Sequence, residues 1–200
     1  YERKDKFCFA GSYYHRYEDS CRVFDAFADV FAEGRGLDIY DRNYGEPGPM
    51  TAFPKKYAPM ILGKLEPEDI DVAYKGYRFG LNMSSVTQSQ TMFARRVFEL
   101  MASNTLVVSN FCRGIKNYFG DLVICTDDAA SLKAALEQRC QNPIMEDKLR
   151  LAALRAVLRE HLCEDRLDEV VERVFGKSIK RQLPTIVVCS HVHTQQEADR

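Results

Sequence analysis

Short apolar runs alternate along this chain of 200 residues with segments whose apolar side chains recur at helical spacing. Near the start, "KFCFAGS" at 6–12 precedes a helical segment from Tyr17 to Glu33, and "LDIYD" follows at 37–41. Later apolar runs of the same kind are "YRFGLNM", "LVVS" and "LVICT". Strands of this kind, alternating with helices, form mostly parallel sheets that are covered on both faces. The pattern therefore predicts a three-layer α/β/α, Rossmann-like domain.

The pattern changes after Pro143, where two helical segments follow one another and end at Gly176. We therefore expect the Rossmann-like domain to cover residues 1–176. Residues 177–200 would form a linker and the truncated start of a following domain, with a strand in "PTIVVCSHVH". The chain starts at Tyr1 without a Met, which indicates a piece of a longer polypeptide.

Charge and cysteine usage restrict the class of protein. The 28 basic and 29 acidic residues nearly cancel, so no global field points to nucleic acid or to an anionic membrane. No apolar run is long enough for a transmembrane segment. The seven cysteines are widely spaced and contain no CxxC pair, which favours reduced thiols and a cytoplasmic location.

The segment from Gln90 to Asn110 predicts an amphipathic helix, an abrupt stop and a short strand, with Arg95, Arg96 and Glu99 on the polar face of the helix. These charges have two interpretations: an exposed Arg95–Glu99 pair, or groups that contact a ligand. In a doubly wound sheet, ligands bind beyond the carboxyl ends of the strands, where loops lead into helices. An arginine there can clamp phosphate, and a carboxylate can bind the diol of a ribose.

Four segments resemble, in the same order, the CgeB-like glycosyltransferases, which are relatives of the group 1 glycosyltransferases with GT-B architecture. "RRVFELMASNTLVVSN" resembles the family's R-x-F-E-x-x-A segment, and "FAGSYYHR" resembles its opening strand and Gly-Ser/Thr turn. "YRFGLNMSS" is similar to the strand before the helix, and "REHLCEDRL" to the closing H-T-Y-x-x-R motif. The resemblance covers residues from Phe7 to Phe175.

This resemblance implies the C-terminal half of a GT-B enzyme, which binds a nucleotide-sugar donor. Glu99 would contact the ribose and Arg96 the phosphates, while Gly11, Ser12 and Arg16 would lie near the phosphates or the transferred sugar. We also assign Asn82, at the end of its strand, to substrate binding. No metal and no cofactor are expected, and the catalytic residues stay unknown. A glycan or other acceptor would bind through the missing half, so the fragment would be inactive alone.

The chain departs from the pattern at two positions. Group 1 enzymes carry a second glutamate eight residues before the ribose-binding one, and Thr91 stands there in this chain. Direct recognition of the sugar hydroxyls as in those enzymes is therefore in doubt. Asn104 replaces the small residue after the helix, and asparagine tolerates the left-handed conformation that a helix end needs. An alternative function is a non-catalytic Rossmann-like module that mediates assembly within a larger protein.

Other motifs have structural interpretations beside functional ones. Asp69 and Asp71 form a D-x-D, but acidic residues also stabilise a helix start. His161 and Arg166 could support the donor pocket, or act only as structural hydrogen-bonding groups. Arg42 and Asn43 could line the pocket mouth or only form a turn. No P-loop and no G-x-G-x-x-G is present, which argues against NTPases and dehydrogenases. A metal site is one interpretation of Cys189, His191 and His193, but a truncated strand also explains them.

Overall fold

A computed structural model describes residues 2–46, 48–140, 142–179 and 194–195. The chain divides into two compact units, residues 1–158 and 159–200. The second unit contains helix α7 (Cys163–Phe175), which ends at Gly176 in the left-handed conformation, with φ of 67°. The expected boundary at residue 176 stays a prediction. The expected strand after Pro184, with Cys189, His191 and His193, lies outside the described residues.

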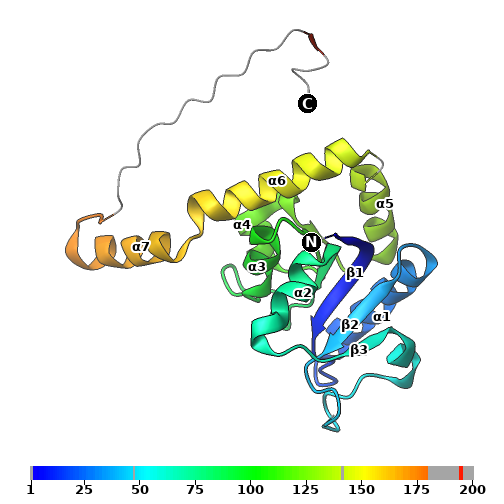
Figure 1. Cartoon of the computed structure of the whole chain (residues 1–200). Helices are drawn as coiled ribbons and strands as arrows, with labels where there is room; N and C mark the ends of the chain where they lie inside the picture. The colour runs from blue at the N-terminus through cyan, green and yellow to red at the C-terminus, as the bar shows by residue number, and fades with distance from the viewer. Residues whose placement is uncertain (1, 47, 141, 180–193, 196–200) are drawn as a thin grey trace. The chain divides into compact units, whose positions relative to one another are not determined.

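The first unit is built on a six-stranded sheet in which every paired strand is parallel (Figure 1). The order across the sheet is β3-β2-β1-β4-β5-β6. The strands are β1 (Lys4–Gly11), β2 (Leu37–Asp41), β3 (Ile61–Gly63), β4 (Tyr77–Asn82), β5 (Leu106–Ser109) and β6 (Ile124–Cys125). Helices cover both faces, so the predicted three-layer, Rossmann-like fold is confirmed.

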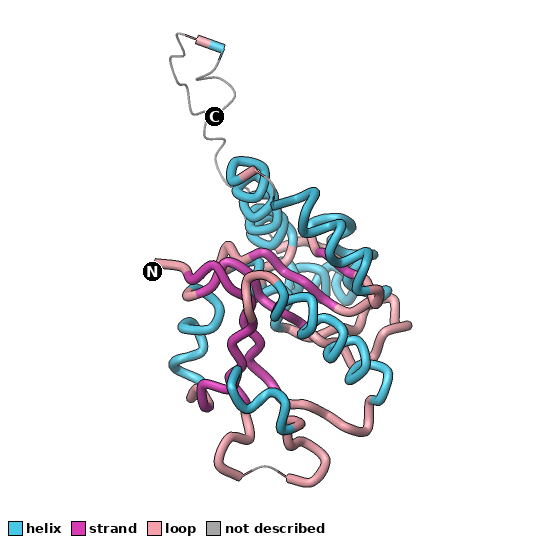
Figure 2. Tube along the Cα trace, turned by 90° about the vertical axis from the view of Figure 1, so that its right-hand side faces the viewer, coloured by secondary structure: helices cyan, strands magenta, loops and turns pink. Residues whose placement is uncertain are grey.

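Helices lie on both sides of the sheet (Figures 1 and 2), and each face of the sheet has its own core. On one face the rings of Phe7 and Phe31 stack with their centroids 3.7 Å apart. On the other face Val107 packs in a cluster with Val97, Leu100 and Ile115. The first face is covered by α1 (Glu18–Glu33), the 3₁₀ helix η1 (Lys55–Met60) and α5 (Ala129–Cys140). The second is covered by α2 (Ile70–Lys75), α3 (Arg96–Ala102), α4 (Arg113–Phe119) and α6 (Pro143–Glu160).

The helix predicted from Gln90 is wrong in its first turns, because α3 begins only at Arg96. The preceding residues form a loop in which the Ser89 hydroxyl accepts hydrogen bonds from the backbone N–H groups of Thr91 and Met92. Phe93, in this loop, stacks on Phe98 at 5.2 Å between ring centroids and also contacts the aromatic rings of α4. Packing between segments thus overrides the local helical spacing.

Three further local features complete the sheet and its cover. The connection between β5 and β6 contains α4, where Gly114 is buried against the Phe93 ring. The 3₁₀ helix η1 ends at Met60, and the next residues add the edge strand β3, which pairs with β2. Asp128 caps α5, because its Oδ2 accepts the N–H of Ser131 at 2.7 Å.

The strand order reverses between β1 and β4, which are neighbours in the sheet but far apart in sequence. A crevice opens where the strand order reverses, beyond the carboxyl ends of the strands, and ligands bind there in open α/β sheets. In this chain those strand ends are Gly11 and Asn82. Elsewhere, the 3₁₀ turns η2 (Pro67–Asp69) and η3 (Gly120–Leu122) precede α2 and β6.

Candidate functional site

A cavity of about 470 Å³ lies beyond the carboxyl end of β1, beside α2 and α3. We call it the Glu99 cavity. Its wall includes Gly11 at the end of β1, Arg42 after β2, Tyr74 of α2, and Arg96 and Glu99 of α3. These residues come from segments more than 80 positions apart, and only the folded sheet brings them together. The volume is within the range of small-molecule sites, about 300–1,000 Å³.

Glu99 is fixed in this cavity by two neighbours. The Tyr74 hydroxyl donates to its Oε2 at 3.1 Å, and Arg95 Nε lies 2.6 Å from its Oε1. Burial raises the pKa of Tyr74, and the nearby Arg96 guanidinium opposes that rise. The Arg95 side chain is 88% exposed, so the ion pair holds Glu99 only weakly. A carboxylate has about four acceptor positions, which leaves capacity for two hydroxyl groups.

The Arg96 side chain extends from the first residue of α3 to the residues of β1. Its guanidinium carbon is 5.2 Å from the centroid of the Phe9 ring, a cation–π contact. Its Nε is buried and has no hydrogen-bond partner among the described residues. A Cβ on Gly11 would meet the Arg96 Nη2 at 2.9 Å, so the glycine leaves room for the guanidinium. A buried donor without a partner is costly and favours a site for an anion.

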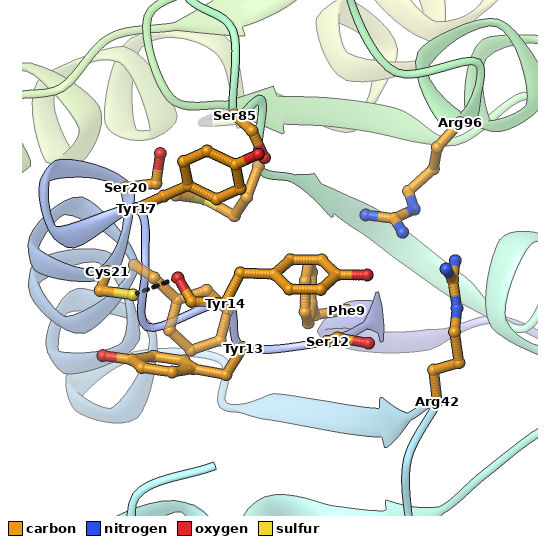
Figure 3. A pocket seen from close by; sticks show the side chains of 12 residues that line it. Phe9, Ser12, Tyr13, Tyr14, Tyr17, Ser20, Cys21, Arg42, Ser85 and Arg96 are labelled. Carbon is orange, nitrogen blue, oxygen red and sulfur yellow. Dashed lines mark hydrogen bonds between the residues drawn. The ribbon is translucent and has the colours of Figure 1, made fainter. Parts of the chain in front are cut away.

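A second cavity, of about 80 Å³, also has Arg96 in its wall (Figure 3). We call it the tyrosine cavity, because Tyr13, Tyr14 and Tyr17 form much of its wall. The Ser12 side chain also faces it, and Ser12 Oγ accepts a hydrogen bond from Asn43 Nδ2 at 2.9 Å. That bond joins the loop after β1 to the loop after β2.

Two of the residues predicted to bind substrate lie outside both cavities. Asn82 is fully buried, and its Nδ2 donates to Ser84 Oγ at 3.1 Å and to Ser109 Oγ at 2.9 Å. It therefore joins the loops that leave β4 and β5. Arg16 is exposed, and its guanidinium carbon lies 4.7 Å from the centroid of the Tyr17 ring. Gly11, Ser12, Arg96 and Glu99 are the predicted residues that line a cavity.

A family model described as "Glycosyl transferase-like" matches residues 34–172 of the chain. That match covers most of the chain, including α3 with Arg96 and Glu99. The chain belongs to the glycosyl transferase-like family. The comparison with curated proteins found no match.

Solved glycosyltransferases share the fold of this family member. Sucrose-phosphate synthase from Thermosynechococcus elongatus superposes with a TM-score of 0.61 at 13% identity, over 86% of this chain and 46% of that one. A glycosyltransferase from Rickettsia africae gives a TM-score of 0.58 at 13% identity, over 87% of this chain and 49% of that one. A variant of TarM from S. aureus, in complex with fondaparinux, alpha-GlcNAc-glycerol and UDP, gives 0.57 at 13% identity, over 86% and 36%. The chain thus spans less than half of each of these structures and matches one half of a GT-B fold.

The sequence alone did not assign several residues that line the two cavities. It carries no signal for Tyr74, because the contact of its hydroxyl with Glu99 depends on the packing of α2 on α3. The tyrosines after β1 had a signal, an aromatic cluster in "GSYYHRY" directly after a strand. Arg42 was considered at the pocket mouth, and the structure places it in the walls of both cavities.

The remaining candidates lie elsewhere. Asp71 faces Lys75 within α2, and Asp69 is exposed. Among the described residues, no group of three or more metal-ligating side chains is close enough to hold a metal ion. In the second unit Arg166 donates to the Glu160 carbonyl at 2.6 Å, and its guanidinium is 3.5 Å from His161 Nδ1. Their support of the donor pocket stays a prediction. No helix within the described ranges has the length and apolar character needed to cross a membrane.

Proposed function

We propose that this chain is the donor-binding half of a glycosyltransferase of the CgeB-like type and that it binds a nucleotide-sugar in the Glu99 cavity. The observation that carries the proposal is the position of Glu99 and Arg96, a carboxylate and a guanidinium in one cavity at the switch point of the sheet. The carboxylate would accept hydrogen bonds from the ribose hydroxyls, and the guanidinium would bind a phosphate oxygen. UDP, which is present with TarM, is therefore the first nucleotide to test.

The reaction that we propose is transfer of a glycosyl group from the donor to an acceptor hydroxyl. The bond between C1 of the sugar and the diphosphate oxygen breaks, and its electron pair stays on that oxygen. The acceptor oxygen forms the new bond to C1 and gives its proton to a base. Arg96 would stabilise the charge that develops on the diphosphate, in the way that fixed donors stabilise developing anions. Side chains would supply this charge stabilisation, so neither a metal ion nor a cofactor is part of the proposal.

We propose that the acceptor and the base bind to the part of the enzyme that this chain does not include. The chain spans less than half of the solved glycosyltransferases that it resembles, which supports this division. The full-length enzyme would work in the cytoplasm on cell-surface polysaccharide or glycoconjugate synthesis. The 200 residues alone would bind donor weakly and catalyse no transfer, and turnover of a nucleotide-sugar onto an acceptor by this chain would refute that division.

Binding is tested by calorimetry and thermal shift with UDP, GDP, CDP, dTDP and their sugars, each with EDTA and with Mg²⁺. We expect one nucleotide family to bind equally well in both conditions. Glu99→Ala and Arg96→Ala should each weaken it by about tenfold or more, since each removes a hydrogen bond to a charged group. Arg155→Ala, an exposed change on α6, is the matched control. If no nucleotide binds at millimolar concentration, the proposal fails in favour of a non-catalytic interaction module.

A further inference from the structure

The Glu99 cavity and the tyrosine cavity share two of their lining residues, Arg42 and Arg96. Arg42 follows the end of β2, whereas Arg96 begins α3 on the other side of the strand β1. The backbone N–H of Arg42 donates to the Gly11 carbonyl at 3.1 Å, which fixes the start of its loop against the end of β1. Figure 3 shows the two guanidinium groups pointing toward one another across the opening.

Two guanidinium groups that face each other repel unless an anion lies between them. Within the described parts of the chain, neither Arg42 nor Arg96 forms a salt bridge with a carboxylate. Arg96 also keeps its buried Nε without a hydrogen-bond partner. Arginine forks match the oxygens of phosphate groups and bind them in pairs. The charge and the geometry of this junction therefore fit a diphosphate, whose two phosphate groups can each take one fork.

The contents of the two cavities fix the order of a ligand that passes between the arginines. The Glu99 cavity is the larger, about 470 Å³, and holds the carboxylate suited to a ribose. The tyrosine cavity, about 80 Å³, has room for part of a single sugar unit. Its wall combines aromatic rings with the hydroxyls of Ser12 and Ser85, and Figure 3 shows the Tyr14 ring extending toward the two arginines. Aromatic faces and hydroxyls suit a sugar ring, which has apolar C–H faces and polar edges.

Thr91, in the loop before α3, is not among the residues that line the two cavities. It occupies the position of the second glutamate of group 1 enzymes. From the loop after β4, Met83 and Ser85 line the tyrosine cavity instead. A glycosyl group in the tyrosine cavity would therefore contact residues of the loops after β1 and β4.

We propose that Arg42 and Arg96 form a two-sided clamp for the diphosphate of a nucleotide-sugar and that the tyrosine cavity is the subsite for its glycosyl group. This inference rests on the proposed function, because it divides the same donor between the two cavities. It adds Arg42 as a diphosphate-binding residue and Tyr14 as a residue that contacts the glycosyl group.

The clamp is tested by calorimetry with the nucleoside, the monophosphate, the diphosphate and the nucleotide-sugar of the base that binds best. Arg42→Ala should lower the affinity for the diphosphate and for the nucleotide-sugar by about tenfold or more. It should lower the affinity for the nucleoside by less than about threefold. Arg42→Lys keeps the positive charge but loses the forked guanidinium. Its affinity for the diphosphate should therefore lie between that of Arg42→Ala and that of the unchanged chain. Arg155→Ala should leave all four affinities unchanged.

The subsite is tested with Tyr14→Ala. This variant should lower the affinity for the nucleotide-sugar by about fivefold or more but change the affinity for the diphosphate by less than about twofold. Tyr44→Ala, an exposed tyrosine that lines neither cavity, is the control. Two results would overturn this division of the donor. One is that Arg42→Ala loses as much affinity for the nucleoside as for the diphosphate, and the other is that Tyr14→Ala loses as much affinity for the diphosphate as for the nucleotide-sugar. If Glu99→Ala weakens binding while neither variant has an effect, the proposed function stands and this inference fails. If no nucleotide binds at all, both fail.

Discussion

Arg96 and Gly11 depend on each other although 85 positions separate them in the sequence. The Arg96 guanidinium lies over the Phe9 ring, and the absence of a side chain at Gly11 leaves space for its Nη2. The glycine is the last residue of β1, where the proposed ligand would also approach the backbone. Glycine at this position therefore leaves the space that the arginine side chain occupies.

Gly11→Ala should weaken nucleotide binding by displacing Arg96. The new Cβ would lie 2.8 Å from Phe9 Cζ and 2.9 Å from Arg96 Nη2, so the guanidinium must move. We expect an affinity loss of about tenfold with a cost in stability of about 1–3 kcal/mol. Calorimetry and denaturant unfolding measure the two effects. Gly48→Ala, where the nearest atom would be 3.4 Å away, is the control, and unchanged affinity in Gly11→Ala would contradict the prediction.

Asp38 is a buried carboxylate at the start of β2 that is unrelated to the cavities. Burial alone would raise its pKa, but hydrogen bonds from Lys6 Nζ at 2.8 Å and Tyr77 Oη at 2.9 Å outweigh that effect. The pKa of Asp38 therefore lies below its ordinary value of about 3.9. Its contribution to stability is present above pH ~4 and is lost as the pH falls through the lower, folded-state pKa.

Asp38→Asn should lower the free energy of unfolding at pH 7 by about 1–3 kcal/mol, because the charged acceptor of two hydrogen bonds is lost. The difference from the unchanged chain should shrink as the pH falls below about 4. Urea unfolding at a series of pH values measures it. Asp19→Asn, an exposed change in α1, is the control, and a difference that stays constant with pH would count against the assigned cause.

Among the elements, α3 carries the two charged residues that we propose bind the donor, and it is positioned by its contact with β4. Its Leu100 side chain packs directly over Gly80 in the middle of that strand. The helix has only seven residues, and short helices depend on tertiary packing for their stability. The packing of Leu100 on Gly80 therefore sets where Arg96 and Glu99 lie relative to the sheet.

Gly80→Ala should cost about 1–3 kcal/mol, because its Cβ would lie 2.5 Å from Leu100 Cδ2 in a full core. Leu100→Ala alone should cost about 2–5 kcal/mol through the cavity that it leaves. The double variant should be more stable than the sum of the two losses predicts, since the new methyl group occupies part of that cavity. Denaturant unfolding of all four proteins completes the cycle, and additive losses would exclude this contact.

For the whole molecule, the sheet and its covering helices lie in the first unit, and α6 is part of that cover. Ala153 and Val157 of α6 are buried in the cluster that includes α3 and α4. Glu146 of α6 is also buried, and its Oε2 lies 2.5 Å from Arg78 Nη2. Removal of α6 would expose apolar surface and leave Arg78 without this partner.

Two truncations test this division of the chain. A chain that ends at residue 176 should keep a single cooperative unfolding transition and the same nucleotide affinity, because every strand of the described sheet lies before that point. A chain that ends at residue 142 loses α6 and should unfold at lower temperature or fail to fold cooperatively. Circular dichroism and thermal unfolding distinguish them. Equal stability of the two truncated chains would show that α6 is dispensable.

The sequence alone determined the features that depend on local spacing. The alternation of apolar runs and helical segments was sufficient for the three-layer fold, because each strand and helix signals the side that it buries. Asn104 has φ of 54°, the left-handed conformation predicted for it at the end of α3. The Arg95–Glu99 pair was one of two interpretations drawn from an i,i+4 spacing, and the two side chains form an ion pair at 2.6 Å. These features require only neighbours within a turn of a helix or a strand.

Only the tertiary structure decided which of the polar residues share a site. Asn82 ends one strand and Ser12 follows another, yet Asn82 is buried in hydrogen bonds that join the ends of β4 and β5, whereas Ser12 lines a cavity. The loop around Phe93 is not helical because its ring packs on residues of α4 that come 25 positions later. Strand order then brings Arg42 and Arg96 to one junction. Contacts between distant segments set these positions, and local spacing carries no information about them.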